Sequence, residues 1–215
     1  MAKKVGIVGS GGVAQTLAAG FVKHGYEVKM GSRDVKKLDE FAGKHGGKVG
    51  VGSFADAATF GEIVVLAVKG KVAKDALALA GAANLKGKTI IDPTNPIEDA
   101  PPDNGVLKFF SQINRSLMED LQEAYPDAHF VKAFSMIGGP HMVNPQFASA
   151  PTMFICGNNA GAKKDVSDVL VKFGFEVEDM GAATAARAIE PLCILWCIPG
   201  MTGGGWNHAF KLLRK

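Results

Sequence analysis

The sequence has few cysteines, and they do not form a recognisable site. The three thiols, at Cys156, Cys193 and Cys197, lack the paired spacing of a zinc site or a disulfide framework. Cys193 and Cys197 lie one helical turn apart, which favours packing on a shared helix face. This low cysteine content is consistent with a reducing compartment. We therefore expect a cytoplasmic protein without a metal centre.

Long apolar runs and strong charge are also missing. The longest apolar candidate, residues 189–201, is interrupted by Glu190, Pro191 and Pro199, so no membrane-spanning segment is predicted. The net charge of +3 is too small to predict binding to nucleic acid or to an anionic membrane. The hydrophobic content of 47% is enough to form a core, and 215 residues suit one domain with a small extension.

The signatures of nucleophilic, metal-dependent and phosphoryl-transfer catalysis are absent as well. There is no G-x-S-x-G elbow and no H-E-x-x-H pair. The glycine-rich segment near the start lacks the Gly-Lys-Ser/Thr ending of a Walker loop. The sequence therefore shows no side-chain machinery of these familiar kinds.

What is present is a glycine-rich turn between a strand and a helix. Residues 5–8 are an apolar run typical of a buried parallel strand, and a helical pattern follows the turn. Gly9 permits the tight turn, and Gly11 lets a pyrophosphate approach the backbone at the helix N-terminus. Ala14 takes the third small position of the fingerprint. The predicted dinucleotide-binding loop is Gly9, Ser10, Gly11, Gly12 and Val13.

The second strand, residues 27–30, leads into the segment that would read the ribose of that dinucleotide. NAD sites usually place an acid there, whereas this chain has a hydroxyl and a guanidinium at Ser32 and Arg33. Arg33 can bind a 2′-phosphate as a bidentate fork, and Lys37 follows one turn later. These residues favour NADP over NAD, although Asp34 could still reach a ribose.

Strand and helix patterns alternate along the rest of the chain, which predicts a Rossmann-type, doubly wound parallel α/β sheet. We expect residues 1–180 to form the NADP-binding domain, with strands near 151–157 and 175–181 resuming the sheet. Residues 181–215 are expected to form a C-terminal helical extension, in which the helical pattern reaches Leu213 with a glycine break at residues 203–205. In the helix after the strand at 62–69, Val72, Ala76, Leu79 and Ala80 are predicted to face inward.

Two loops leave the carboxyl ends of later strands, where ligands bind in such sheets. Asn95 could bond the nicotinamide or its ribose, or only fix an Asn-Pro turn, and the sequence leaves both readings open. The loop from Ser135 to His141 should wall a second substrate. His141 could donate a proton or bind an acidic group there, although an ordinary surface role is the simpler reading. The candidate second-substrate residues are Ser135, Met136, Ile137, Gly138 and His141.

A pair of stacked redox cofactors needs little from the protein's side chains. The cofactor carries the hydride, and the protein aligns donor and acceptor and excludes water. We therefore expect no catalytic acid or base.

In combination, the motifs resemble the coenzyme F420-dependent NADP oxidoreductase family, which includes F420H2:NADP oxidoreductases and the cytoplasmic domains of membrane ferric reductases. The resemblance covers nearly the whole chain. It rests on the glycine loop, on Gly31-Ser32-Arg33 with Lys37, on residues 91–96 (IDPTNP), on residues 131–134 (VKAF), on residues 155–157 (ICG) followed by Lys163-Lys164, and on residues 186–192 (ARAIEPL).

The resemblance implies that the glycine loop binds the pyrophosphate and that Ser32, Arg33 and Lys37 contact the 2′-phosphate. It implies that the C-terminal helices pack between two subunits of a homodimer. The residues that it places around the nicotinamide and its ribose are Ala67, Val68, Lys69, Asn95, Ala133 and Phe134.

Two positions depart from the family pattern: Ser135 stands where many relatives have Asn, and Lys69 where archaeal F420 enzymes have proline. The hydride acceptor therefore stays open among F420, a flavin (FMN or FAD) and a small molecule. Two other hypotheses remain beside this one. The chain could be a non-enzymatic NADP-binding sensor or scaffold, or a reductase of a small imine or carbonyl compound.

Overall fold

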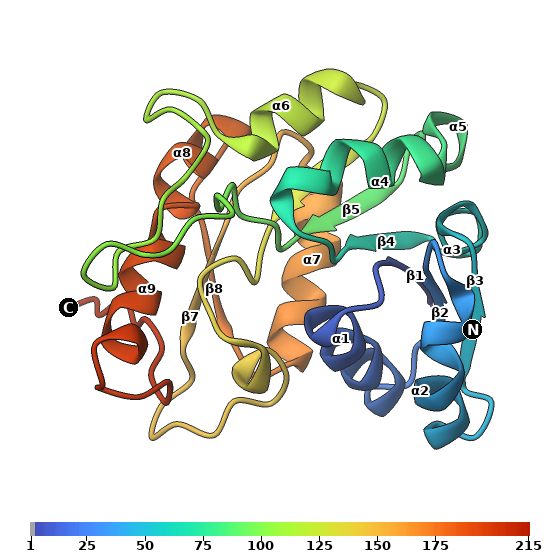
Figure 1. The fold of residues 1–215 in the computed structure, drawn as a ribbon, viewed down its shortest axis with the longest axis horizontal. Coiled ribbons are helices and arrows are strands. Elements are labelled where there is room, and N and C mark those ends of the chain that lie inside the picture. The colour runs from blue at the N-terminus through green and yellow to red at the C-terminus, as the bar shows by residue number, and fades with distance from the viewer. Residues whose placement is uncertain (1–2) are drawn as a thin grey trace.

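The computed structural model describes residues 3–215, whose central feature is a six-stranded parallel sheet in the order β3-β2-β1-β4-β5-β6 (Figure 1). This is the strand order of the Rossmann fold, and it confirms the predicted fold class. The strands are β1 (Lys4–Val8), β2 (Glu27–Gly31), β3 (Val49–Gly52), β4 (Ile63–Leu66), β5 (Thr89–Asp92) and β6 (His129–Lys132).

Helices cover both faces of this sheet. On one face α1 and α7 meet where the rings of Phe21 and Phe173 lie 5.0 Å apart, and α3 and α4 pack together on the other (Figure 1). The α-helices are α1 (Gly12–Lys23), α2 (Asp39–Lys44), α3 (Phe54–Phe60), α4 (Ala73–Ala80), α5 (Ala82–Leu85), α6 (Leu117–Ala124), α7 (Ala160–Lys172), α8 (Ala186–Ile189) and α9 (Leu192–Met201).

The central strands are apolar on both sides because helices cover both of their faces. All four residues of β4 are buried, and so are residues 5–8 of β1. At Gly6 a Cβ would lie 1.9 Å from the carbonyl oxygen of Ala57, so the backbone of α3 approaches β1 as closely as a glycine allows. The core therefore continues through the sheet into both helix layers.

The buried face of α4 includes the predicted Ala76 and Ala80 but not Leu79, and Val72 is half-buried in the short turn before the helix. Leu77 is completely buried, whereas Leu79 is 56% exposed. The helical period places Ala73, Ala76, Leu77 and Ala80 on one face, and Leu79 falls outside it. Within residues 3–215, none of the helices has the length and apolar character that crossing a bilayer requires.

Strands β7 (Thr152–Ile155) and β8 (Glu176–Asp179) do not resume the main sheet as predicted. They pair with each other as a separate two-stranded parallel sheet. One antiparallel bridge, between Lys132 and Cys156, connects them to β6. The reason is the connection from β6 to β7, which lacks the crossover helix that a parallel neighbour usually requires.

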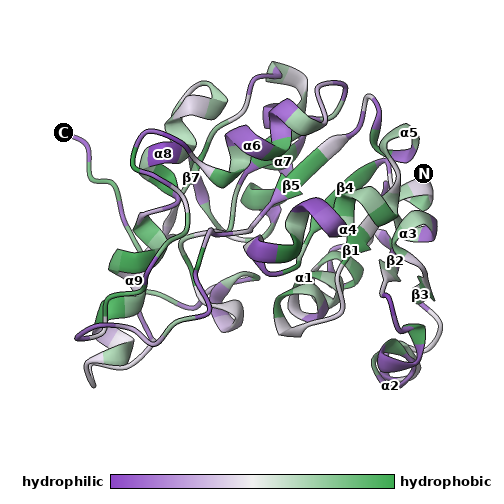
Figure 2. Ribbon diagram, turned by 45° about the horizontal axis from the view of Figure 1, so that its top comes forward, coloured by the Kyte–Doolittle hydropathy of each residue, from purple (hydrophilic) through white to green (hydrophobic). Residues whose placement is uncertain are grey.

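The C-terminal segment begins with two helices, as predicted, but the helical pattern ends at Met201 instead of Leu213. Gly203 and Gly205 have φ values of +94° and +80°, which an α-helix does not accommodate. Beyond them the chain runs beside β7, where the amide of Thr152 donates to the carbonyl of Phe210 over 2.9 Å. Helix α9 is largely hydrophobic, as its colour in Figure 2 shows.

Candidate functional site

The glycine turn after β1 is held between the tips of two neighbouring strands. The Gly9 amide donates to the carbonyl of Gly31 in β2 over 3.1 Å, and the Ala67 amide after β4 donates to Val8 over 2.9 Å. Gly9 has a φ of +149°, and a Cβ there would lie 2.1 Å from the Ala67 carbonyl oxygen. Only glycine fits this position, so the turn that starts α1 is fixed by the backbone.

The N-terminus of α1 is exposed at this turn. No side chain caps the helix, and its first turn carries no acidic residue. Gly11 and Gly12 are exposed, and a Cβ on either would meet nothing within 4 Å. The first amides of a helix have no partner inside the helix, so this end offers N–H donors and a positive dipole to an anion.

The tip of β2 lies beside this turn. Ser32 is buried, and its hydroxyl lies 3.3 Å from the hydroxyl of Ser10. The same oxygen of Ser32 accepts the Asp34 amide over 3.2 Å. Arg33 and Lys37 are exposed, and neither forms an ion pair with any residue in the range 3–215. The structure therefore brings Ser32 to the glycine loop and leaves two cations at the surface next to it.

The residues predicted around the nicotinamide are exposed to very different degrees. Ala67 and Ala133 are buried, Val68 is half-buried, and the Lys69 side chain is 83% exposed, 3.7 Å from Asp99. Phe134 is buried with a φ of +63°, a strained conformation for a bulky residue. Its ring packs toward the rings of Phe173 and Phe175 in the core, so only its backbone faces the strand edge.

Asn95 and Ser135 meet at the carboxyl ends of β5 and β6. The Asn95 side-chain amide donates to the Ser135 carbonyl over 2.7 Å. The Asn95 Oδ1 and the Ser135 Oγ are both buried without a hydrogen-bond partner among the described residues. Buried polar atoms are rarely left unpaired. One acceptor and one hydroxyl at this point match the N–H and C=O groups of a carboxamide such as that of nicotinamide.

The loop expected to wall a second substrate is mostly covered by the protein itself. Ser135, Met136 and Ile137 are buried. The backbone of Gly138 lies against Trp196, because a Cβ at Gly138 would be 2.4 Å from the indole ring. His141 is half-buried, with its ring centre 5.0 Å from that of Phe147. The turn at Gly139–His141 contacts α1, which places this loop beside the helix of the glycine turn.

One buried cluster was not predicted from the sequence. Lys132 Nζ lies 2.7 Å from Asp92 Oδ2 and 2.9 Å from Glu190 Oε1, and these side chains are at most 2% exposed. Burial alone lowers the pKa of Lys132, but the two carboxylates outweigh it and hold this pKa above its usual value. A lysine at the end of an apolar strand was visible in the motif at residues 131–134, but its two partners come from distant segments.

The cysteines have no arrangement that indicates a site. Burial raises the pKa of the Cys156 thiol to about 12, so it is protonated and unreactive at neutral pH. Among residues 3–215 no group of His, Cys, Asp and Glu side chains has the geometry to hold a metal ion.

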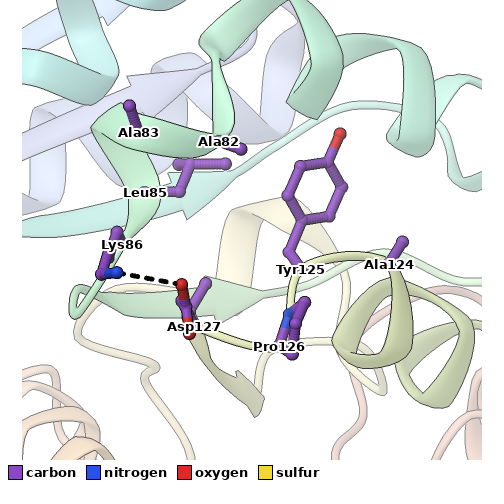
Figure 3. A pocket seen from close by; sticks show the side chains of 9 residues that line it. Ala82, Ala83, Leu85, Lys86, Ala124, Tyr125, Pro126 and Asp127 are labelled. Carbon is purple, nitrogen blue, oxygen red and sulfur yellow. Dashed lines mark ion pairs between the residues drawn. The ribbon is translucent and has the colours of Figure 1, made fainter.

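A cavity of about 250 Å³ lies at the amino ends of the strands, opposite the candidate cofactor site (Figure 3). It is formed by the segments that precede β5 and β6, with the Lys86–Asp127 ion pair of 3.3 Å on its wall. Ligands of parallel sheets bind at the carboxyl ends of strands, and this cavity is at the amino ends. It is therefore separate from the candidate cofactor site.

Comparison with known proteins places this geometry in a family. Residues 4–96 match the family model described as NADP oxidoreductase, coenzyme F420-dependent. The structure superposes on that of a proposed F420-dependent NADP reductase from Arthrobacter sp. FB24 with a TM-score of 0.90. The two are 32% identical, and the match covers 99% of both chains. The chain belongs to the coenzyme F420-dependent NADP oxidoreductase family. By family it is an NADP-dependent oxidoreductase.

The chain is also similar to part of two metalloreductases. Metalloreductase STEAP3 of Rattus norvegicus is 33% identical over 214 residues, and metalloreductase STEAP2 of Homo sapiens is 30% identical over 189 residues. These alignments cover 95% and 87% of this chain. They cover only 40% and 35% of the metalloreductases, so the chain spans well under half the length of these relatives.

Proposed function

We propose that this protein binds NADP(H) along the carboxyl edge of its sheet and transfers a hydride between the nicotinamide and a deazaflavin or flavin acceptor. The observation that carries the proposal is the pair of unpartnered buried atoms, Asn95 Oδ1 and Ser135 Oγ. They lie at the same strand edge as the uncapped N-terminus of α1, where a pyrophosphate would sit. One dinucleotide can place its pyrophosphate at the N-terminus of α1 and its carboxamide at Asn95 and Ser135.

Each part of the cofactor has a matching protein group in this proposal. The backbone amides at the start of α1 bind the pyrophosphate, with the exposed Gly11 leaving room for it. Ser32, Arg33 and Lys37 bind the 2′-phosphate, where Arg33 supplies a planar fork of donors. Asn95 and Ser135 hold the carboxamide, with Ala67, Val68, Lys69, Ala133 and Phe134 around the nicotinamide and its ribose.

The bound cofactor supplies a hydride, that is, a proton with two electrons, to an acceptor carbon or nitrogen beside it. The protein's residues align the nicotinamide with the acceptor and exclude water. The residues assigned to the acceptor side are Ser135, Met136, Ile137, Gly138 and His141. Because Ser135 to Ile137 are largely buried, the acceptor would contact this loop mainly through Gly138 and His141.

The names of the relatives support two acceptors. The Arthrobacter protein is described as F420-dependent, and it matches this chain over its full length, which favours the deazaflavin. The STEAP proteins are described as metalloreductases, which favours an electron-transfer chain that ends on a metal ion. A flavin would link NADPH to such one-electron chemistry.

The decisive experiment measures NADPH oxidation by the purified protein with F420 and with FMN in parallel. Turnover with F420 but not FMN supports the deazaflavin enzyme, and turnover with FMN alone supports the flavin-linked route. NADPH binding without turnover on either acceptor would contradict hydride transfer to both and leave an NADP-binding sensor. The Gly11→Ala variant is the matched control, because its methyl group would occupy the pyrophosphate position.

We also propose that the protein is a cytoplasmic homodimer joined through its C-terminal helices. Several apolar side chains of this region are exposed, including Leu195 at 54% and Trp206 at 46%. A partner subunit would cover them. Light scattering during size-exclusion chromatography tests this directly, since a monomer at micromolar concentration would contradict it.

A further inference from the structure

The Lys132–Asp92–Glu190 cluster surrounds the lysine Nζ with three oxygen atoms that lie within 2.9 Å of it. Besides the two carboxylates, Lys132 Nζ donates to the carbonyl oxygen of Thr94 over 2.7 Å. The contact between Lys132 Nζ and Asp92 Oδ2 is an ion pair without hydrogen-bond geometry, so the lysine is held by the charges of the carboxylates as well as by the Thr94 carbonyl. The cluster is therefore a group of charges closed to solvent.

The charges in this cluster do not cancel. Two carboxylates and one ammonium give a formal charge of −1. Glu190 also accepts the amides of Leu117 and Met118 at the start of α6, whose dipole contributes about +0.5. The cluster and the helix end together therefore carry a net charge of about −0.5 in the protein interior.

Exposed lysine side chains do little to cancel this net negative charge. Lys69 and Lys71 have side chains that are 83% and 62% exposed, and both are shared with Asp99. Solvent screens exposed charges of this kind far more than buried ones.

The cluster lies directly behind the position proposed for the nicotinamide, and the inference rests on that proposed function. Asp92 and Lys132 are the last residues of β5 and β6, at the carboxyl edge of the sheet. The Thr94 carbonyl that Lys132 binds belongs to the residue before Asn95. The Glu190 carboxylate is thus on the order of 10 Å from the Asn95 side chain.

We propose that Glu190, together with the Lys132–Asp92 pair, tunes the site toward the oxidised cofactor. The nicotinamide ring carries a positive charge when oxidised and none when reduced. A fixed negative charge behind it stabilises only the charged form, and the low polarity of the interior strengthens the effect. The cluster therefore favours donation of the hydride from NADPH to the acceptor over the reverse transfer.

The test compares the dissociation constants of NADP⁺ and NADPH, measured by calorimetry without any acceptor. The change Glu190→Gln removes one negative charge and keeps an acceptor for the helix amides. We expect it to weaken NADP⁺ binding about three- to tenfold more than NADPH binding, as a unit charge at this distance predicts. Glu40→Gln is the control, because it removes the same charge from an exposed pair on α2 and should leave the ratio of the two constants unchanged.

A double variant separates charge from structure. Lys132→Met combined with Glu190→Gln restores the formal charge of −1 and should return the ratio toward that of the wild type. If Glu190 acts only by holding α6 in place, the double variant will stay as impaired as the single one for both cofactors, which overturns the proposal. An unchanged ratio in a folded Glu190→Gln protein overturns it as well.

The wild-type protein provides a test that does not depend on any variant folding. It should bind NADP⁺ at least about as tightly as NADPH. If NADPH binds more than about tenfold more tightly than NADP⁺, the cluster does not set the preference, although the site itself stands. Failure to bind either nucleotide would instead contradict the proposed function.

Discussion

At the scale of the single residue, the glycines of the first turn have separate tasks. Gly9 is required by the fold, since its φ of +149° and its contact with the Ala67 carbonyl exclude a side chain. Gly11 has φ −77° and open space around it, so the fold tolerates a side chain there. The fingerprint predicted this division, with Gly9 for the turn and Gly11 for the approach of the pyrophosphate, and the structure adds the contact that excludes a side chain at Gly9.

These two glycines give opposite predictions. Gly9→Ala should destabilise the protein by about 2–4 kcal/mol, because of backbone strain and the clash with Ala67. Gly11→Ala should change the free energy of unfolding by less than about 1 kcal/mol. It should nevertheless weaken NADPH binding about tenfold, or roughly 1.4 kcal/mol. Denaturant unfolding and a binding titration measure both quantities, and equal stability losses would contradict the assignment.

Arg33 is the residue that we expect to select NADP(H) over NAD(H). Arg33→Ala should weaken NADPH binding about ten- to a hundredfold, the loss of one or two charge-assisted hydrogen bonds. NADH binding should change less than about twofold, since NADH lacks the 2′-phosphate. Lys44→Ala is the control, because Lys44 is an exposed lysine of α2 that pairs with Glu40. Equal losses for NADPH and NADH would exclude contact with the 2′-phosphate.

At the scale of the element, α6 shows how local and distant residues combine at a helix start. Ser116 and Glu119 form a capping box, and the pattern S-x-x-E marks the helix start in the sequence. The distant partners, Arg187 on Glu119 and Glu190 on the first amides of the helix, have no signal in the local sequence.

The same element gives a pH-dependent prediction. Arg187, followed by hydrogen bonds from Ser116, lowers the pKa of Glu119 from 4.5 to about 2 despite its burial. Because the folded pKa is depressed, the stabilisation is complete above pH 4.5 and is lost as the pH falls toward 2.

Glu119→Gln should therefore cost about 1–2 kcal/mol at pH 7, a value reduced for the partial exposure of Arg187. The difference from the wild type should shrink below pH 3, as urea unfolding at pH 7, 4 and 2.5 would show. Glu40→Gln is the matched control on an exposed pair and should show no measurable change. A difference that does not depend on pH would contradict the ionic role of Glu119.

At the scale of the whole molecule, the C-terminal segment and the sheet are joined through the core. Glu190 joins the segment to Lys132, and Trp196 packs on the loop at Gly138. A truncation therefore tests whether the predicted domain boundary after residue 180 separates two independently folded parts. Removing residues 181–215 would leave the buried Lys132 with one carboxylate and would uncover the loop at Gly138 that Trp196 contacts.

We expect the truncated protein, residues 1–180, to lack a cooperative thermal transition, because breaking a buried ion pair costs about 3–5 kcal/mol before any apolar surface is counted. Circular dichroism during heating measures this. Removing only residues 214–215 is the control, since it breaks just the surface pair of Arg214 with Glu178. A cooperative transition in the 1–180 protein would show instead that the first part is an independent domain.

The sequence by itself determined the fold class, the glycine turn and the residues at the strand tips. These follow from periodicity, from glycine stereochemistry and from the rule that carboxyl ends of parallel strands share one edge. Only the tertiary structure decided which long-range partners meet: Asn95 with Ser135, Lys132 with Asp92 and Glu190, and β7 with β8 outside the main sheet. Such contacts depend on how segments far apart in the chain pack together, so a local pattern of residues does not predict them.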